Sequence, residues 1–272
     1  PGAGGAAKFC FPKDLVIMRP VVANHCKTHP KLPWLVSVAV TAGTLSLADA
    51  RASNKFLEIP PEKQAQDSPA YHYANMSDQQ VLSELARRGI AFERATPPMP
   101  GVRLPIRLTA PLHGVTIHSS LPEDQWRSTP FDILDGRLAL ALYDFTRILA
   151  QHDVVELVHF TIYRPAPVVP IDPNVPQTRH PGGMAIDVGA LRKKNGDWLA
   201  VGSHWSARIG AKTCGDGGRS LQDRHGRELL SIVCETADQR IFHYMLTPHF
   251  DPAHSDHLHL EIKPGVRWFL IN

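Results

Sequence analysis

The sequence predicts an α+β fold with a mainly antiparallel sheet and flanking helices. Helical and strand patterns are mixed along the chain, without the repeating strand–helix–strand order of a parallel α/β protein. The strand patterns are short, and the 24 prolines of this 272-residue chain favour many breaks because proline removes a backbone donor. An apolar fraction of 43% is enough for a sizeable core and excludes a disordered chain.

The first fifty residues are typical of a secretory signal. Basic residues and histidines follow Met18, an apolar run covers residues 32–47, and residues 48–50 form a small-x-small cleavage pattern. The run is shorter than the ~20 residues that span a bilayer. We therefore expect residues 1–50 to be a signal-like or non-domain segment, with translation starting at Met18. The alternative is a buried helix or strand of the mature fold.

This interpretation places the mature protein outside the cytoplasm of a bacterium, secreted or periplasmic, with no stable membrane span. The four cysteines fit it: Cys10 and Cys26 would leave with the signal, while Cys214 and Cys234 would remain, twenty positions apart. A disulfide between the remaining two suits an exported protein. The alternative is two free thiols in a cytosolic protein. No CxxC pair occurs, which argues against a structural zinc knuckle.

Residues 51–77 are polar and contain several prolines, so we expect a linker there and the domain itself over residues 78–272. The domain begins with a predicted helix over residues 78–89, which Ser77 or Asp78 can cap and Gly89 can end. Short strands separated by proline and glycine are expected from there to residue 117.

The strongest helical pattern covers residues 136–152, where apolar side chains form a broad stripe. A β-rich run over residues 153–163 follows, and we expect its His159 to serve packing. Four further histidines have no partner motif and are assigned no role; they are His204, His225, His243 and His249.

The second half of the domain contains a hairpin and a final strand. Asn195-Gly196 is the hairpin signal, joining a strand over residues 185–191 to one over residues 198–202. Residues 257–262 alternate between polar and apolar, so His257, His259 and Glu261 are expected on one face of the last strand.

Two segments could together hold a metal ion. Catalytic zinc usually has three protein ligands and an open position for water. Residues 178–187 and 254–259 supply two imidazoles, one carboxylate and two spare histidines for such a set. His180 and Asp187 are seven residues apart, which would put them on opposite faces of a straight strand. The Gly182-Gly183 pair allows a turn that carries the histidine ahead of the strand that carries the aspartate. A structural ion pair between His180 and Asp187 is the alternative.

The two histidines of the last strand could have different parts in the chemistry. Residues two apart on a strand point the same way, ~6.5–7 Å apart, so His257 and His259 can face one cavity, with one binding a metal and the other beside it. A metal would lower the pKa of its water to roughly 7. A neutral histidine beside it can accept the proton and return it to a leaving amine. Alternatively, both histidines face solvent from the strand.

These segments also carry a family resemblance. Residues 178–187 resemble the SxHxxGxAxD motif of zinc D-Ala-D-Ala peptidases, with threonine for serine, and the ending resembles the HxH motif of their wider group. That group includes lysostaphin-type and penicillin-insensitive murein endopeptidases. Over roughly residues 80–272 the chain most resembles bacterial extensin-like proteins, which have a similar helix at residues 136–142, then Tyr163-Arg164, and a DHLHL ending.

The resemblance implies a D-Ala-D-Ala peptidase/murein endopeptidase-like fold and one Zn²⁺ ion held by His180, Asp187 and His259. It implies that His257 stands beside the water. It also implies that Arg164 holds the substrate carbonyl or the developing oxyanion, a role that is often the largest catalytic term. A surface charge is the alternative for this arginine.

Two further residues precede the HxH motif. His254 matches an additional histidine that lies near the metal in murein endopeptidases, and Asp256 could orient an imidazole from outside the ligand set. Both could instead be plain turn residues. D-Ala-D-Ala peptidases use a glutamate base, but no ExxH precedes His259 here, so His257 is the expected base and Glu261 the less favoured one.

The function that follows is a zinc-dependent hydrolase that cleaves peptide bonds in peptidoglycan stem peptides or cross-links. The net charge of +3 comes without a long basic block, which argues against a nucleic-acid partner. One alternative is a non-catalytic metal-containing cell-wall-binding domain. Another is a non-haem iron oxygenase, whose triads commonly place the carboxylate two residues after the first histidine, unlike the spacing here.

Overall fold

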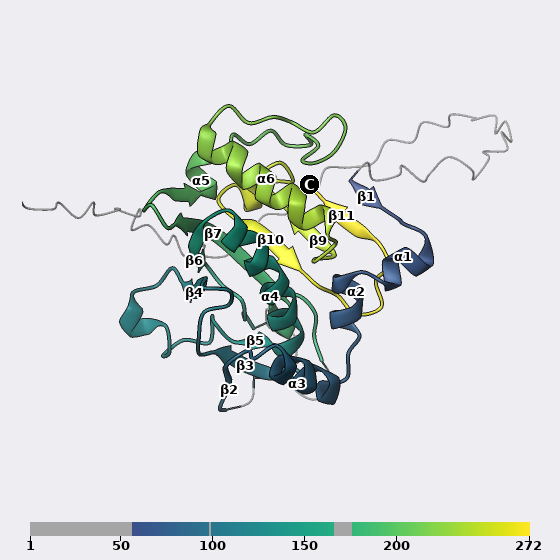
Figure 1. Ribbon diagram of the computed structural model, residues 1–272, viewed down its shortest axis with the longest axis vertical. Helices are drawn as coiled ribbons and strands as arrows, with labels where there is room; N and C mark the ends of the chain where they lie inside the picture. The colour runs from purple at the N-terminus through teal and green to yellow at the C-terminus, as the bar shows by residue number, and fades with distance from the viewer. Residues whose placement is uncertain (1–55, 98, 166–175) are drawn as a thin grey trace, which may run out of the picture. The chain divides into compact units, whose positions relative to one another are not determined.

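A mixed eight-stranded sheet forms the centre of the fold (Figure 1). Its strands are β1 (Leu57–Glu58), β4 (Thr116–Ser119), β6 (Val154–His159), β7 (Ala185–Lys193), β8 (Trp198–Ala200), β9 (Tyr244–Leu246), β10 (Leu258–Glu261) and β11 (Phe269–Ile271). In space they follow the order β1-β11-β9-β10-β7-β6-β4, and β8 pairs with β7. Most pairs are antiparallel, but β9 with β11 and β4 with β6 are parallel. The α+β prediction is therefore confirmed, with a sheet of mixed direction.

The structure is a computed structural model that describes residues 56–97, 99–165 and 176–272. These belong to one compact unit that spans Arg51–Asn272. The predicted signal over residues 1–50, with Cys10 and Cys26, lies outside the described residues. Within the described ranges, no helix has the length and apolar character needed to cross a membrane.

Six α-helices occur in the described part of the chain, and two long ones lie across one face of the sheet (Figure 1). The helices are α1 (Glu62–Gln66), α2 (Pro69–Ala74), α3 (Asp78–Arg87), α4 (Gly136–Gln151), α5 (Val201–His204) and α6 (Arg224–Asp238). The two long helices, α4 and α6, bury apolar side chains in the main core together with those of β7 and β10. A small second sheet contains β2 (Phe92–Arg94), β3 (Pro105–Leu108) and β5 (Leu134–Asp135).

Helix α3 forms where the sequence predicts it. The Ser77 hydroxyl accepts a hydrogen bond from the backbone N–H of Gln80 at 3.3 Å, and the Gln80 side chain accepts one from the Ser77 N–H at 2.8 Å. This reciprocal pair is a capping box, which satisfies two donors that the first helical turn leaves free. Val81 and Leu85 are fully buried. Gly89, with φ of +65°, ends the helix.

The linker expected over residues 51–77 is corrected for its described part, residues 56–77. These residues contain β1, α1 and α2, and Ala70 and Tyr73 lie in the main core. The Tyr73 hydroxyl donates to the Asp144 carboxylate of α4 at 2.5 Å. The prolines mark helix starts here: Pro69 is the first residue of α2, where a missing N–H costs nothing.

The predicted hairpin and disulfide are both present. The Asn195-Gly196 turn joins β7 to β8. Strand β8 ends at Ala200, two residues earlier than expected, because α5 begins at Val201. Cys214 and Cys234 form a disulfide with their Cα atoms 5.4 Å apart. Closing a loop of this length stabilises the fold by about 3 kcal/mol in the chain-entropy model.

His159 lies fully buried in β6, as expected for a packing residue, and makes the fold sensitive to acid. Neither of its ring nitrogens has a hydrogen-bond partner among the described residues. Burial lowers the pKa of this imidazole from 6.5 to about 3. Between these two values the unfolded chain binds a proton that the folded chain does not, so stability falls as pH falls.

We expect the wild-type protein to lose roughly 2 kcal/mol of unfolding free energy between pH 6.5 and pH 5 through this one residue. Urea unfolding at the two pH values measures the loss. His159→Leu should make the curve flatter, whereas His72→Leu, at an exposed histidine, should leave it unchanged. Equal pH dependence in the wild type and His159→Leu would contradict the prediction.

Candidate metal centre

The pairing of β7 with β10 places two of the predicted ligands opposite each other. His259 is the antiparallel partner of Asp187 in this register. Cross-strand partners project from the same face of a sheet. Leu258 and Leu260 alternate with His259 and belong to the main core under the helices. The aspartate and the histidine therefore lie on the face of the sheet opposite α4 and α6.

A tight turn brings His180 to the same place. The residue begins the 3-10 turn η2 (His180–Gly182), which precedes β7 as the glycine pair predicts. Gly183 has φ of +62°, a left-handed conformation that favours glycine. A Cβ on Gly182 would lie 2.1 Å from the backbone oxygen of Gln177, so a side chain cannot fit there.

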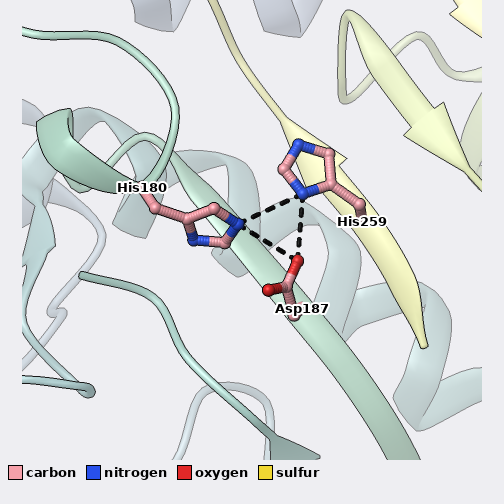
Figure 2. A group of neighbouring side chains, drawn as sticks. All are labelled: His180, Asp187 and His259. Carbon is pink, nitrogen blue, oxygen red and sulfur yellow. Dashed lines mark hydrogen bonds and ion pairs between the residues drawn. The ribbon is translucent and has the colours of Figure 1, made fainter. Parts of the chain in front are cut away.

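The three side chains converge on one point (Figure 2). His180 Nε2 lies 3.2 Å from Asp187 Oδ1 and 3.3 Å from His259 Nδ1, and the Asp187 Oδ1–His259 Nδ1 distance is 2.9 Å. Ligand atoms that bind a tetrahedral zinc at about 2.0–2.1 Å lie about 3.3 Å from one another. The triangle thus matches the spacing of a zinc ligand set.

The hydrogen bonds on the far side of each imidazole turn a lone pair toward this point. The His180 Nδ1–H donates to the backbone oxygen of Ile162 at 2.8 Å, which leaves Nε2 without a proton in the neutral ring. His259 Nε2 lies 3.3 Å from Glu261 Oε2, and donation to that carboxylate leaves Nδ1 free. Such outer acceptors orient metal-binding histidines in proteins. The donor set therefore fits a divalent cation.

The same contacts shift the acid–base balance of the site. Burial opposes the charge of Asp187, but the hydrogen bonds and the charges of His180 and His259 outweigh it, so the pKa of this carboxyl falls far below its usual range. Burial also opposes the charge of His259, and the hydrogen bonds to Asp187 and Glu261 outweigh it and raise the pKa of the imidazole. The aspartate is therefore ionised at neutral pH and available as a ligand.

Two more histidines stand beside the triangle. His257 Nε2 lies 3.6 Å from Asp187 Oδ1, while its Nδ1 lies 2.8 Å from the Asp256 carboxylate. The ring of His254 is 5.2 Å from that of His257, and its Nδ1 lies 2.7 Å from Asp251 Oδ1. Each ring is held through Nδ1 by a carboxylate, which leaves Nε2 to act as an acceptor.

The predicted Arg164 is near the site through its backbone. Its N–H donates to the backbone oxygen of His180 at 3.3 Å, and its side chain is exposed. No ion pair joins its guanidinium to the described residues. The structure thus places this arginine beside the candidate ligand His180.

Sequence patterns missed or underestimated three contributors to the site. Asp251 orients His254 and caps the short 3-10 turn that contains it. The sequence signal for this cap was an aspartate followed by proline, three residues before the histidine. Glu261 is buried, and its Oε2 lies 3.3 Å from His259 Nε2. Arg179, whose Nε lies 3.5 Å from Glu261 Oε2, was given no role.

A second group, His204, Asp223 and His225, also lies close together. No motif in the sequence predicts a role for these histidines. Their lone pairs are already used: His204 Nδ1 accepts from the Ala200 N–H at 3.0 Å, and His225 Nε2 accepts from the Arg224 guanidinium at 2.9 Å. This group is therefore a poorer fit to a cation than the triangle.

One family model matches much of the region that contains the site. Residues 139–269 match the family model described as the extensin-like protein C-terminus. The match supports the extensin-like family. It covers a shorter part of the chain than residues 80–272, over which the sequence resemblance was drawn, but it includes all three residues of the triangle. No curated protein and no solved structure matches the chain.

Proposed function

We propose that this extensin-like protein is a zinc-dependent hydrolase that cleaves peptide bonds of peptidoglycan stem peptides or cross-links. The observation that carries the proposal is the triangle of His180 Nε2, Asp187 Oδ1 and His259 Nδ1, with all three separations at 3.3 Å or less. Two nitrogens and one carboxylate oxygen, all buried, form the ligand set of a catalytic zinc with an open position.

A zinc ion bound there would supply a water of lowered pKa and polarise the substrate carbonyl. His257 would take a proton from that water at Nε2, because Asp256 holds its Nδ1 on the other side. It would return the proton to the amine that leaves when a bond from the carbonyl carbon to the water oxygen replaces the C–N bond.

Arg164 is proposed to steady the negative charge that develops on the carbonyl oxygen. Its position rests on the backbone contact to His180 and on an exposed cationic side chain beside a ligand. Donors aimed at such an oxygen lower the barrier because they need no reorganisation during the reaction.

The proposed substrate and location follow from the resemblance to the zinc D-Ala-D-Ala peptidases and murein endopeptidases. We propose the corresponding peptidase-like fold for the domain, and a secreted or periplasmic location in a bacterium. The disulfide between Cys214 and Cys234 supports export, because such bonds persist in oxidising compartments.

Chelation tests the proposal directly. Purified protein is incubated with muropeptides before and after removal of metal by a chelator, and again after zinc is restored, and new amino groups are identified by mass spectrometry. We expect turnover that disappears with the chelator and returns with zinc. Turnover that the chelator leaves unchanged would exclude the metal role. Bound metal without turnover would favour the non-catalytic cell-wall-binding domain.

A further inference from the structure

The segment that joins α5 to α6 lies beside α6 (Figure 1). Between the two is a cavity of about 400 Å³. On the side of the helix, its lining contains Arg227, Leu230, Ser231 and Cys234. Residues three and four apart on a helix are neighbours, so these side chains form one face of α6. The cavity contains no residue of the metal centre, which lies on the face of the sheet opposite this helix.

A disulfide and a turn fix the other wall of the cavity. Cys214 lines the cavity and is bonded to Cys234 of α6, with the two Cα atoms 5.4 Å apart. The Arg219 N–H donates to the backbone oxygen of Lys212 at 2.8 Å and closes the turn between them. The cavity therefore exists before a ligand binds, and a preformed site loses less conformational entropy on binding.

The charged groups in the lining are all positive. The side chains of Arg219 and Arg227 line the cavity, and no lining residue is acidic. Neither guanidinium forms an ion pair with the residues that the structure describes. Arg224, at the start of the same helix, is by contrast paired with Asp197 at 3.1 Å. Two cations without a partner in one cavity favour an anionic ligand.

One of these arginines also has a buried donor without an acceptor. Arg219 Nε is shielded from solvent and has no hydrogen-bond partner in the described ranges. A buried donor that has lost water without gaining an acceptor destabilises the fold. An oxygen of a bound anion would supply the missing acceptor. The hydroxyl groups of Ser220 and Ser231 line the same cavity and add further donors.

We propose that this cavity binds the phosphate group of a phosphate ester. The donors come from both walls, which suits a tetrahedral group with oxygens on every side better than a planar carboxylate. Arginine pairs with phosphate oxygens through two parallel hydrogen bonds. A water molecule takes up about 30 Å³ in the liquid, so a cavity of about 400 Å³ has room for the alcohol part of the ester beside the phosphate. The site is independent of the proposed function.

The competing explanation is that water fills the cavity and the two arginines only keep the surface soluble. The two explanations differ in selectivity. A cavity that holds only water binds no anion at a fixed place, so the loss of either arginine changes anion binding no more than the loss of any other surface charge. A phosphate site distinguishes phosphate from other anions and weakens when either arginine is replaced.

The test measures binding by calorimetry with the purified full chain at constant ionic strength. The probes are inorganic phosphate, sn-glycerol 3-phosphate, glycerophosphoglycerol and acetate. We expect the phosphate compounds to bind about tenfold more tightly than acetate, the size of one hydrogen bond to a charged group. The two esters distinguish the sources of the ligand. Tighter binding of the monoester indicates a soluble phosphate compound, and tighter binding of the diester indicates a phosphodiester polymer.

Three variants assign the binding to the cavity. Arg219→Gln and Arg227→Gln should each weaken binding of the esters by about tenfold. Arg227 is exposed, so its variant gives a result even if the loss of Arg219 disturbs the fold. Arg94→Gln removes the same charge from an exposed position in β2, outside the cavity, and should bind the esters as the wild type does.

Equal binding of phosphate compounds and acetate, or no binding of either ester at millimolar concentration, would overturn the inference. Binding that persists in both arginine variants but disappears in Asp187→Asn would place the phosphate at the metal centre and overturn it as well. Failure of the proposed function is recognised separately, in the chelation assay on muropeptides, because the phosphate titration requires neither cleavage nor the metal ligands.

Discussion

Asp187→Asn is expected to reduce zinc affinity by more than about 100-fold. Removing a residue that only hydrogen-bonds to a metal ligand typically costs about 10–100-fold, and losing a ligand should cost more. Asp187 Oδ1 is the atom that both His180 Nε2 and His259 Nδ1 approach, at 3.2 Å and 2.9 Å. Asparagine keeps the volume but removes the negative charge that balances the cation. Metal content after dialysis, followed by competition with a chelator of known affinity, measures the change.

The second histidine group provides the control for this experiment. His225→Gln removes an imidazole from the group around His204 and should leave zinc content unchanged. Circular dichroism establishes whether each variant is folded before metal is measured. Loss of zinc from His225→Gln together with full zinc content in Asp187→Asn would assign the metal to the other group and remove the basis of the proposed function.

His257→Gln is expected to keep zinc and lower kcat by about 10²–10⁴-fold, the range of general acid–base catalysis. The ring lies beside the triangle, with Nε2 at 3.6 Å from Asp187 Oδ1, but it is not needed to complete the ligand set. Glutamine can accept a hydrogen bond at this position but cannot carry a proton from water to the leaving amine. Metal analysis and turnover of muropeptides, performed on the same preparation, separate the two roles.

Asp256→Asn should lower the rate less than His257→Gln does. Its carboxylate holds His257 Nδ1 at 2.8 Å, so its loss should reduce the rate less than the loss of the ring itself. His249→Gln, at a buried histidine outside the site, is the matched control. Unchanged turnover in His257→Gln would show that another group transfers the proton.

Much of the fold was accessible from local patterns. The Ser77 cap, the apolar stripe of α4 and the Asn195-Gly196 turn each depend on residues a few positions apart, and each element formed close to its predicted bounds. The stretch before α3 was misread because its prolines were taken as breaks. Pro69 instead begins a helix whose burial depends on contacts with α4, far away in the chain.

The candidate site shows the same division. The sequence supplied the residue types and the turn at Gly182-Gly183 that carries His180 ahead of β7. It also indicated that His259 and Glu261 share a face of the last strand, and the 3.3 Å contact between their side chains agrees with this. The sequence could not show that Glu261 contacts His259. A carboxylate on this face could contact either the neighbouring imidazole or a metal-bound water.

The sequence by itself determined most of the elements after residue 77, the disulfide partners and the residue types of the candidate ligand set. Only the tertiary structure decided that they meet, because His180 and His259 are 79 residues apart and come together through the register of β7 against β10. It also decided which nitrogen of each ring faces the centre. That choice depends on acceptors that folding brings to each ring, such as the backbone oxygen of Ile162. Every residue has a backbone oxygen, so the sequence does not indicate which one a histidine will contact.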